Sequence, residues 1–330
     1  MKPWLGAPLV ALSALVIVVG LGVLLRWRVR AWLRVAAGLA LVLPGVIGCG
    51  VGGYWFWFTH RLQPEPVREE WFAGVRYERL VFQQPRPVVA HVVRVDLQEP
   101  GIDFLVTPGQ PSASGEVFAD TTSGFAARHE VQLAINANYF YPFRSNHPLD
   151  YEPHLGDPVH IVGVAASRGS VYGTPAKDMV TLYLSRDHRA SFEQPTGEVW
   201  QAVSGLGYVV RDGAPVAFSE DGFNKVPYPR MLAGVDATGR YLLLLLVDGK
   251  QPAYSEGLTL EEATKLLVKQ GAQTGIQLDG GGSATLVRQD APGHFLVVNT
   301  PTNFRLAGWE RVVATHLGIH ARPLARESRR

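Results

Sequence analysis

The sequence is poor in cysteine, which limits how its fold can be stabilised. It contains one cysteine among 330 residues, and this residue, Cys49, lies inside an apolar run near the N-terminus. The chain therefore cannot form an internal disulfide, and the part after residue 60 must be held together by a packed hydrophobic core. A region of about 250 residues is long enough to bury such a core.

The sequence also lacks an excess of one charge and the common nucleotide motifs. Its formal net charge is +2, which gives no electrostatic reason to expect a nucleic-acid partner. No glycine-rich dinucleotide motif follows a predicted strand, and no phosphate-loop lysine motif occurs. We therefore expect neither a nucleic-acid partner nor a cofactor.

Long uncharged stretches are confined to the first 60 residues. Leu5 to Leu25 carries no charge, and at about 1.5 Å per residue it can cross a hydrocarbon core of roughly 30 Å. A second apolar run, Val35 to Phe58, ends in aromatic residues that favour the membrane interface. The arginines between the runs indicate a cytoplasmic loop by the positive-inside rule.

These runs predict a transmembrane hairpin with helices over residues 5–25 and 35–58. The lipid bilayer would then be a partner, and the chain would be a multi-pass cell-membrane protein with its C-terminal domain outside the cytoplasm. A cleaved signal peptide is the competing interpretation of the first run, although its basic segment contains only Lys2.

Beyond the hairpin, the pattern predicts many short strands. Runs rich in β-branched residues, such as Val88 to Leu97, are bounded by proline and glycine. Tyr241 to Val247 is an unbroken apolar run, typical of a strand that is buried on both faces. These features predict an α+β fold with a strand-rich mixed sheet over residues 73–321. A linker over residues 61–72 would precede this domain, and a basic tail over residues 322–330 would follow it.

One glycine-rich stretch, GIQLDGGGSATLV from Gly275 to Val287, is the strongest candidate for a functional site. A short buried strand is predicted to end at Asp279, and three glycines follow. Such a run is expected where the backbone needs a positive φ, or where a ligand approaches the main chain closely. A carboxylate beside exposed N–H groups and the Ser283 hydroxyl suits catalysis. A glycine-rich hairpin turn capped by Asp279 is an equally good interpretation of these residues alone.

The run LDGGGSATLV resembles the signature of the phosphodiester glycosidase family. The resemblance extends from about Val88 to Ile319, because further motifs also match. It implies a hydrolase that cleaves a sugar-phosphodiester linkage, with a glycan or sugar phosphate as its partner. For bacterial members of the family it implies substrates in envelope or exopolysaccharide material.

The other matching motifs imply substrate-binding residues. Arg230 lies in a Pro-Arg pair before a strand, and the resemblance makes it the leading phosphate ligand, since a planar guanidinium fits a phosphate. Without the resemblance, a surface ion pair would be expected for Arg230 instead. Asn136, Asn299 and Arg311 lie in similar motifs and are expected to make polar or anion contacts. Tyr139 and Phe140, in the same motif as Asn136, could form an apolar platform for a sugar ring, although aromatic residues there are more often core.

A second aspartate, Asp248, repeats the arrangement of Asp279 at the end of the buried apolar run. Between the two, Ser255 to Gln270 predicts a helix in which Thr259 and Glu262 have capping-box spacing. If the strands on either side of this helix are parallel, both aspartates lie on one edge of the sheet.

Cleavage of a glycosyl phosphodiester needs an activated water or nucleophile and stabilisation of the departing phosphate. We therefore predict that Asp279 and Asp248 form the catalytic pair and that Arg230 binds the phosphate. Which carboxylate would act as base or as nucleophile stays open. The backbone donors predicted at the phosphate are those of Gly281, Gly282 and Ser283.

Two other functions remain open from the sequence. One is a non-catalytic glycan-binding module, but the presence of Asp279, Asp248 and Arg230 favours an enzyme. The other is a metal-dependent phosphodiesterase, which would need ligands from the histidine- and acid-rich segment 144–160. The spacing in that segment matches no metal-binding pattern, so a solvated loop and no metal site are predicted.

Overall fold

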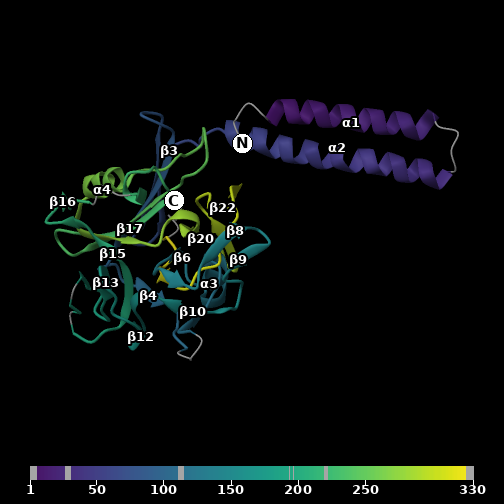
Figure 1. Ribbon diagram of the computed structural model, residues 1–330. Helices are drawn as coiled ribbons and strands as arrows, with labels where there is room; N and C mark the ends of the chain where they lie inside the picture. The colour runs from purple at the N-terminus through teal and green to yellow at the C-terminus, as the bar shows by residue number, and fades with distance from the viewer. Residues whose placement is uncertain are drawn as a thin grey trace, which may run out of the picture. The chain divides into compact units, whose positions relative to one another are not determined.

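The computed structural model describes residues 6–26, 31–110, 115–192, 194–195, 197–218 and 222–324. The chain divides into two compact units, which Figure 1 shows as a helical pair and a strand-rich body. The first unit runs to Leu62 and also includes Pro252–Tyr254, and the second unit begins at Gln63.

The N-terminal unit consists of the helices α1 (Gly6–Arg26) and α2 (Ala31–His60). Small residues let the two helices approach closely. A Cβ atom added at Gly48 would lie 2.1 Å from the Ser13 hydroxyl oxygen, so glycine is needed at this crossing. Small residues serve the same purpose in membrane helix pairs.

One helix among the described residues is long and apolar enough to cross a membrane, and it covers Val35–His60. The apolar part of α1, Pro8–Gly22, is shorter. The structure therefore supports one candidate span, where the sequence predicted two.

The second unit is built on a 12-stranded sheet. Every pairing between its described strands is antiparallel, whereas the sequence predicted a mixed sheet. Its main path runs β1 (Val67–Phe72), β2 (Val75–Phe82), β3 (Val88–Asp96), β18 (Tyr241–Val247), β17 (Arg230–Asp236), β19 (Ala272–Leu278), β15 (Gln201–Arg211), β11 (Gly163–Ser167) and β12 (Ser170–Thr174). Three further strands extend it: β13 (Met179–Leu184) and β16 (Ala214–Pro215) pair with β15, and β14 (Ala190–Phe192) pairs with β13.

A five-stranded sheet packs against the first through the main core. Its order is β21 (His294–Val297), β20 (Leu286–Ala291), β6 (Leu133–Asn136), β24 (His316–His320) and β4 (Asp103–Val106). The remaining strands form small sheets: β5 (Val117–Phe118) with β10 (Pro158–Ile161) and β7 (Phe140–Tyr141), β8 (Arg144–His147) with β9 (Asp150–Glu152), and β22 (Thr302–Asn303) with β23 (Leu306–Ala307). The α+β class is confirmed, with strands predominating.

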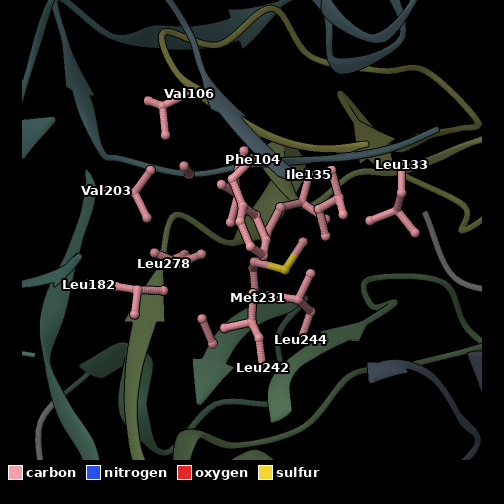
Figure 2. Packing of buried hydrophobic residues seen from close by; sticks show 14 of the residues in the cluster. Phe104, Val106, Leu133, Ile135, Leu182, Val203, Met231, Leu242, Leu244 and Leu278 are labelled. Atoms are coloured by element: carbon pink, nitrogen blue, oxygen red, sulfur yellow. The ribbon is translucent and has the colours of Figure 1, made fainter. Parts of the chain in front are cut away.

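The burial of β18 explains why its whole sequence is apolar. Leu242 and Leu244 lie in the core between the two large sheets with Met231 and Leu278 (Figure 2). Leu243 and the other alternate residues face the opposite side and pack against helix α4 (Leu260–Lys269). Successive side chains of a strand point to opposite faces, so a strand covered on both sides must be apolar throughout, as predicted.

Helices α4 and α3 cover the outer faces of the two large sheets. The predicted capping box of α4 is confirmed, because the Glu262 N–H donates to Thr259 Oγ1 at 3.2 Å and the Thr259 N–H donates to Glu262 Oε2 at 2.9 Å. Helix α3 (Thr122–His129) packs Phe125 against the five-stranded sheet. The unit therefore has the layer order helix, sheet, core, sheet, helix.

The predicted linker over residues 61–72 is wrong in its second half. Residues Val67–Phe72 form β1, which pairs with β2 from Val67 opposite Arg79 to Phe72 opposite Val75. The sequence of this segment is polar because β1 is an edge strand, in which only Trp71 is buried. Of the predicted basic tail, residues 325–330 lie outside the described residues.

Candidate active site

Strand β17 lies between the two strands that precede the predicted catalytic aspartates. It pairs antiparallel with both β18 and β19, so those two strands run parallel to each other. Asp248 follows β18 and Asp279 follows β19, and both strand ends lie opposite the start of β17 at Arg230 and Met231. The two aspartates therefore leave the same edge of the sheet, as expected for parallel strands, but β17 lies between them.

The glycines after Asp279 form a tight turn that ends in the short 3-10 helix η3 (Gly281–Ser283). Gly281 has a φ of +62°, and a Cβ atom there would lie 2.8 Å from Cε1 of Tyr228. A Cβ atom at Gly282 would lie 2.5 Å from Nη2 of Arg311. Glycine is thus required at Gly281 by the backbone conformation, and the absence of a side chain at Gly282 leaves room for the Arg311 guanidinium.

The backbone of this turn is largely occupied by its own hydrogen bonds. The Gly281 N–H donates to the Pro229 carbonyl at 2.9 Å, and the Ser283 N–H donates to the Gly280 carbonyl at 3.1 Å. This contradicts the expectation that these two N–H groups bind a phosphate. The turn still borders a cavity, to which Gly281 and Ser283 contribute but Gly282 does not.

The cavity beside the turn has a volume of about 330 Å³. Its charged lining residues are Asp279, Arg230 and Arg311, and its polar lining residues include Tyr139, Gln277 and Ser283. Within the described part of the chain, Asp279 is the one carboxylate that lines it. This places one predicted catalytic residue and two predicted anion ligands around one space.

The Asp279 carboxylate is partly accessible from the cavity but is otherwise surrounded by protein. Burial raises the pKa of this carboxyl group from 3.8 to about 6. A hydrogen bond from Ser283 and the charge of Arg311 oppose that increase. Arg311 Nη1 in turn donates to Ser283 Oγ at 3.3 Å. The result is a carboxyl group that changes charge just below neutral pH.

The two guanidinium groups at the cavity are held by neutral oxygen atoms. Arg311 donates from Nε and Nη2 to Asn303 Oδ1, at 3.3 and 3.0 Å. Arg230 donates from Nε to the Leu258 carbonyl at 3.1 Å, and from Nη2 to two further backbone carbonyls. Neither guanidinium forms an ion pair with a carboxylate of the described residues. Burial lowers the pKa of both, but an arginine remains charged at neutral pH.

Among the described residues, two positive charges therefore face one carboxylate at this cavity, which favours an anionic ligand. The alternative of a surface ion pair for Arg230 is excluded, because its side chain is only 2% exposed and its partners are carbonyl oxygens.

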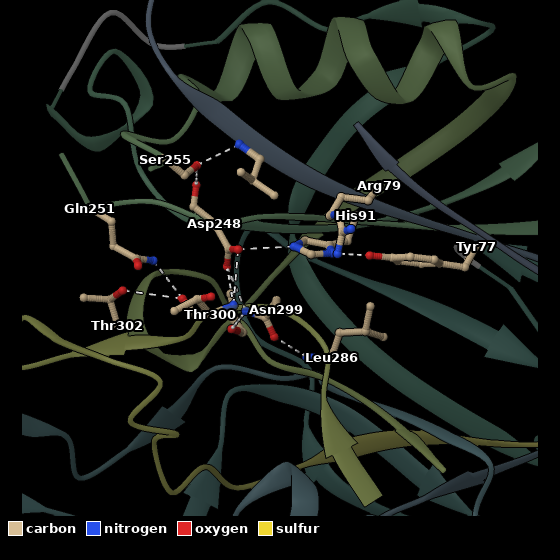
Figure 3. Close-up of polar contacts among 12 residues, drawn as sticks. Tyr77, Arg79, His91, Asp248, Gln251, Ser255, Leu286, Asn299, Thr300 and Thr302 are labelled. Atoms are coloured by element: carbon tan, nitrogen blue, oxygen red, sulfur yellow. Dashed lines mark hydrogen bonds and ion pairs between the residues drawn. The ribbon is translucent and has the colours of Figure 1, made fainter. Parts of the chain in front are cut away.

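Asp248 does not reach this cavity, and the prediction of a catalytic pair is wrong for it. Its side chain is 1% exposed and is turned into the core (Figure 3). Oδ1 accepts from Asn299 Nδ2 and from the Thr300 N–H, both at 3.0 Å, and Oδ2 lies 3.2 Å from His91 Nε2. The other ring nitrogen of His91 lies 2.8 Å from the Tyr77 hydroxyl. A carboxylate so fully occupied by protein groups has no room for a substrate.

The two predicted asparagines also bind protein groups and do not line the cavity. Asn136 donates to the Asp279 carbonyl at 2.6 Å and accepts from the Thr285 N–H at 3.1 Å. Asn299 accepts from the Leu286 N–H at 2.9 Å. Both side chains are buried, at 1% and 7% exposure. The turn leaves backbone groups without sheet partners, and buried groups of this kind need a polar side chain. Both residues position the turn.

Sequence reasoning missed several residues of the cavity wall. Gln277 and Tyr228 line it, and Gln277 Nε2 donates to the Tyr139 hydroxyl at 2.9 Å. Burial raises the pKa of Tyr139, so this hydroxyl stays neutral. A polar glutamine between Ile276 and Leu278 in a buried strand was the available signal, since such a residue needs a partner or a ligand.

The segment 144–160 forms a hairpin and a further strand with ion pairs of its own. Arg144 Nε lies 2.9 Å from Asp150 Oδ1, and His154 Nδ1 lies 3.4 Å from Asp157 Oδ2. In the part of the chain that the structure describes, no three His, Cys, Asp or Glu side chains converge as metal ligands would.

Comparison of the sequence with protein families identifies the group to which this chain belongs. A family model described as phosphodiester glycosidase matches residues 129–320, which is more than half of the chain. The chain belongs to the phosphodiester glycosidase family. The matched region includes the glycine turn, Asp279, Arg230 and Arg311.

The phosphodiester glycosidase match is supported by curated relatives. Human N-acetylglucosamine-1-phosphodiester alpha-N-acetylglucosaminidase is 27% identical over 244 residues, which cover 69% of this chain and 45% of the human protein. The Bos taurus protein of the same name is 37% identical over 120 residues, which cover 33% of this chain and 22% of the bovine protein. The chain thus spans less than half the length of these relatives.

Solved structures show the same fold. The catalytic domain of zebrafish N-acetylglucosamine-1-phosphodiester alpha-N-acetylglucosaminidase, auto-inhibited by its pro-peptide, matches with a TM-score of 0.56 and 22% identity, over 80% of this chain and 86% of that chain. A hypothetical protein from Synechocystis matches with a TM-score of 0.51 and 14% identity, over 78% of this chain and 64% of that chain.

Proposed function

We propose that this member of the phosphodiester glycosidase family hydrolyses the glycosidic bond of a glycosyl-1-phosphodiester. The observation that carries the proposal is a carboxylate of raised pKa, Asp279, at a cavity bordered by two buried guanidinium groups. Family membership supports the reaction class. The curated relatives are named for the removal of N-acetylglucosamine from such a phosphodiester.

In the proposed reaction, a water molecule attacks the anomeric carbon of the sugar. Asp279 accepts one proton of that water as the new carbon–oxygen bond forms. The bond between the anomeric carbon and the phosphate oxygen breaks, and its electron pair leaves with the phosphomonoester. The products are a free sugar and a phosphomonoester, and the proton on Asp279 then passes to solvent.

A pKa of about 6 at Asp279 suits the role of general base. A base is most effective when its pKa lies near the working pH, because it is then both ionised and able to hold a proton. Burial raises the pKa of Asp279 into this range, while the hydrogen bond from Ser283 and the charge of Arg311 stabilise its ionised form. An alternative role as nucleophile would be favoured by a lower pKa.

Arg311 and Arg230 are assigned to the phosphate. The departing group gains negative charge as the bond breaks, and preorganised cations near it lower the barrier. A phosphomonoester is already a good leaving group, so a second carboxylic acid to protonate it is unnecessary. In this proposal the one carboxylate that the described residues place at the cavity is enough, where many glycosidases use two.

The location of the enzyme is part of the proposal. The Val35–His60 span would anchor the chain in a membrane, with α1 as a second crossing and the Arg-rich connection on the cytoplasmic side. The catalytic unit would then lie outside the cytoplasm, where envelope or exopolysaccharide material provides the substrate.

Product analysis of the full-length protein with a sugar 1-phosphate methyl ester tests the reaction. We expect free sugar and methyl phosphate in equal amounts, with and without chelator, and inversion at the anomeric carbon by NMR. Release of methanol with sugar 1-phosphate would instead show cleavage of the P–O bond. Retention would make Asp279 the nucleophile, and binding without turnover would indicate a glycan-binding module.

A further inference from the structure

The cavity has an apolar mouth that the proposed hydrolysis does not use. It consists of Phe143, Leu206 and Phe223, which line the cavity and remain 49%, 47% and 70% exposed. They come from three separate segments: the chain after β7, strand β15 and the short helix η2 (Gly222–Asn224). Single exposed apolar side chains are common on proteins, but three that converge on one cavity indicate a ligand.

The apolar mouth is joined directly to the cationic part of the site. The Arg311 guanidinium lies over the Phe143 ring, 4.8 Å from its centroid. Arg230 donates from Nη2 to the carbonyl oxygen of Phe223, and the Phe223 ring meets Tyr228 edge-on at 5.5 Å between centroids. The two arginines proposed to bind the phosphate therefore contact two of the three mouth residues, the Phe143 ring and the Phe223 backbone.

The chemistry of the mouth distinguishes between possible leaving groups. Phenylalanine and leucine side chains have no hydrogen-bond donor or acceptor, so a second sugar could stack on them only by its C–H face, and its hydroxyl groups would find no partner among these side chains. They do gain from covering aliphatic carbon. A group that extends from a phosphate at the arginines onto these side chains would therefore be aliphatic.

We infer that the apolar mouth is a subsite for the leaving group, and that the substrate is a sugar linked through a phosphodiester to an aliphatic alcohol, as in a lipid phosphate. The inference rests on the proposed function and adds the substrate class. The step is the same hydrolysis, in which the phosphomonoester that departs carries the alkyl chain.

Hydrolysis of a sugar 1-phosphate methyl ester and its n-hexyl ester by the full-length protein in nanodiscs tests the inference. We expect kcat/KM to be at least about tenfold higher for the hexyl ester, because each buried methylene is worth a factor of roughly four. The ratio of the two values should fall severalfold in Phe223→Ser and in Leu206→Ser. Phe118→Ser is the matched control, since Phe118 is 50% exposed and does not line the cavity.

Each result supports or overturns the subsite. Equal values for both esters overturn it, and so does a hexyl preference that survives both variants, which would show partition into the bilayer. If no ester is hydrolysed, the proposed function fails, and calorimetry with n-hexyl phosphate and methyl phosphate still decides the subsite. Tighter binding of hexyl phosphate that is lost in Phe223→Ser supports it, and equal binding overturns it.

Discussion

Two aspartates end two parallel strands of this protein, and their surroundings are opposite. Asp279 lines a cavity, where burial raises the pKa of its carboxyl group to about 6. Asp248 is 1% exposed and receives hydrogen bonds from Asn299 and Thr300, with His91 at 3.2 Å. Each follows a largely buried strand and precedes a glycine.

The difference comes from what faces each strand end. Segments distant in the sequence bring His91 and Asn299 to Asp248, and these close its surroundings. At Asp279, the distant partner is Arg311, which reaches it through Ser283 and leaves the cavity side open. One aspartate thus holds the structure together, and the other is available for chemistry.

The sharpest test of the comparison is removal of the charge at Asp279. Asp279→Asn should lower kcat by about 10²–10⁴-fold, the usual contribution of a general base, and leave the circular dichroism spectrum unchanged. Asp187→Asn, at an exposed ion pair with Arg189, is the control and should behave as wild type. Normal turnover by the Asp279→Asn variant would remove the catalytic assignment.

The complementary test is removal of Asp248. Asp248→Ala should lower the free energy of unfolding by about 3–5 kcal/mol, because the buried groups that it satisfies lose their partner. Urea unfolding measures this loss. In the milder Asp248→Asn variant, kcat of the folded protein should fall far less than in Asp279→Asn. A stable Asp248→Asn protein without turnover would mean that Asp248 takes part in the chemistry after all.

The choice of substrate distinguishes the role of the two arginines from that of the carboxylates. Arg311→Ala and Arg230→Ala should each lower kcat/KM for a phosphodiester by roughly tenfold to hundredfold, since a hydrogen bond to a charged group is worth about 1.5–3 kcal/mol. A neutral glycoside should be affected much less, and lysine should restore only part of the activity. Arg76→Ala, which breaks an exposed ion pair with Glu70, should change nothing. Equal losses on both substrates would show that the arginines shape the site without binding the phosphate.

The pH dependence should follow Asp279. Its carboxylate must be ionised to act as base, so kcat/KM should rise with pH and level off above about pH 6. The raised pKa also favours the folded state below pH 3.8, and this contribution is lost as pH rises through about 6. Relative to Asp279→Asn, wild type should therefore lose about 1–3 kcal/mol of unfolding free energy across that range. A pH-independent difference between the two proteins would contradict the raised pKa.

Local sequence signals predicted the local structure well. The capping box of Thr259 and Glu262, the fully buried β18 and the turn of three glycines are all present. Each depends on residues close together in the chain, through strand periodicity, helix capping or the φ preference of glycine. Arg230 and Arg311, which a family resemblance suggested as anion ligands, both line the cavity, and their binding role stays a prediction.

The assignments that were wrong concern side chains whose partners are distant in sequence. Asn136 and Asn299 look like ligands at strand ends, but they fasten the glycine turn through backbone groups near residue 280. The apolar mouth could not be predicted, because Phe143, Leu206 and Phe223 share no local pattern.

The sequence by itself determined the elements of this protein: an apolar N-terminal segment, a strand-rich domain and two aspartates at strand ends beside glycines. Periodicity and backbone preference act over a few residues, so these features can be read along the chain. Only the tertiary structure decided which aspartate faces a cavity. Desolvation and hydrogen bonding depend on every group packed around a carboxylate, and those around Asp248 and Asp279 come from five or more separate segments.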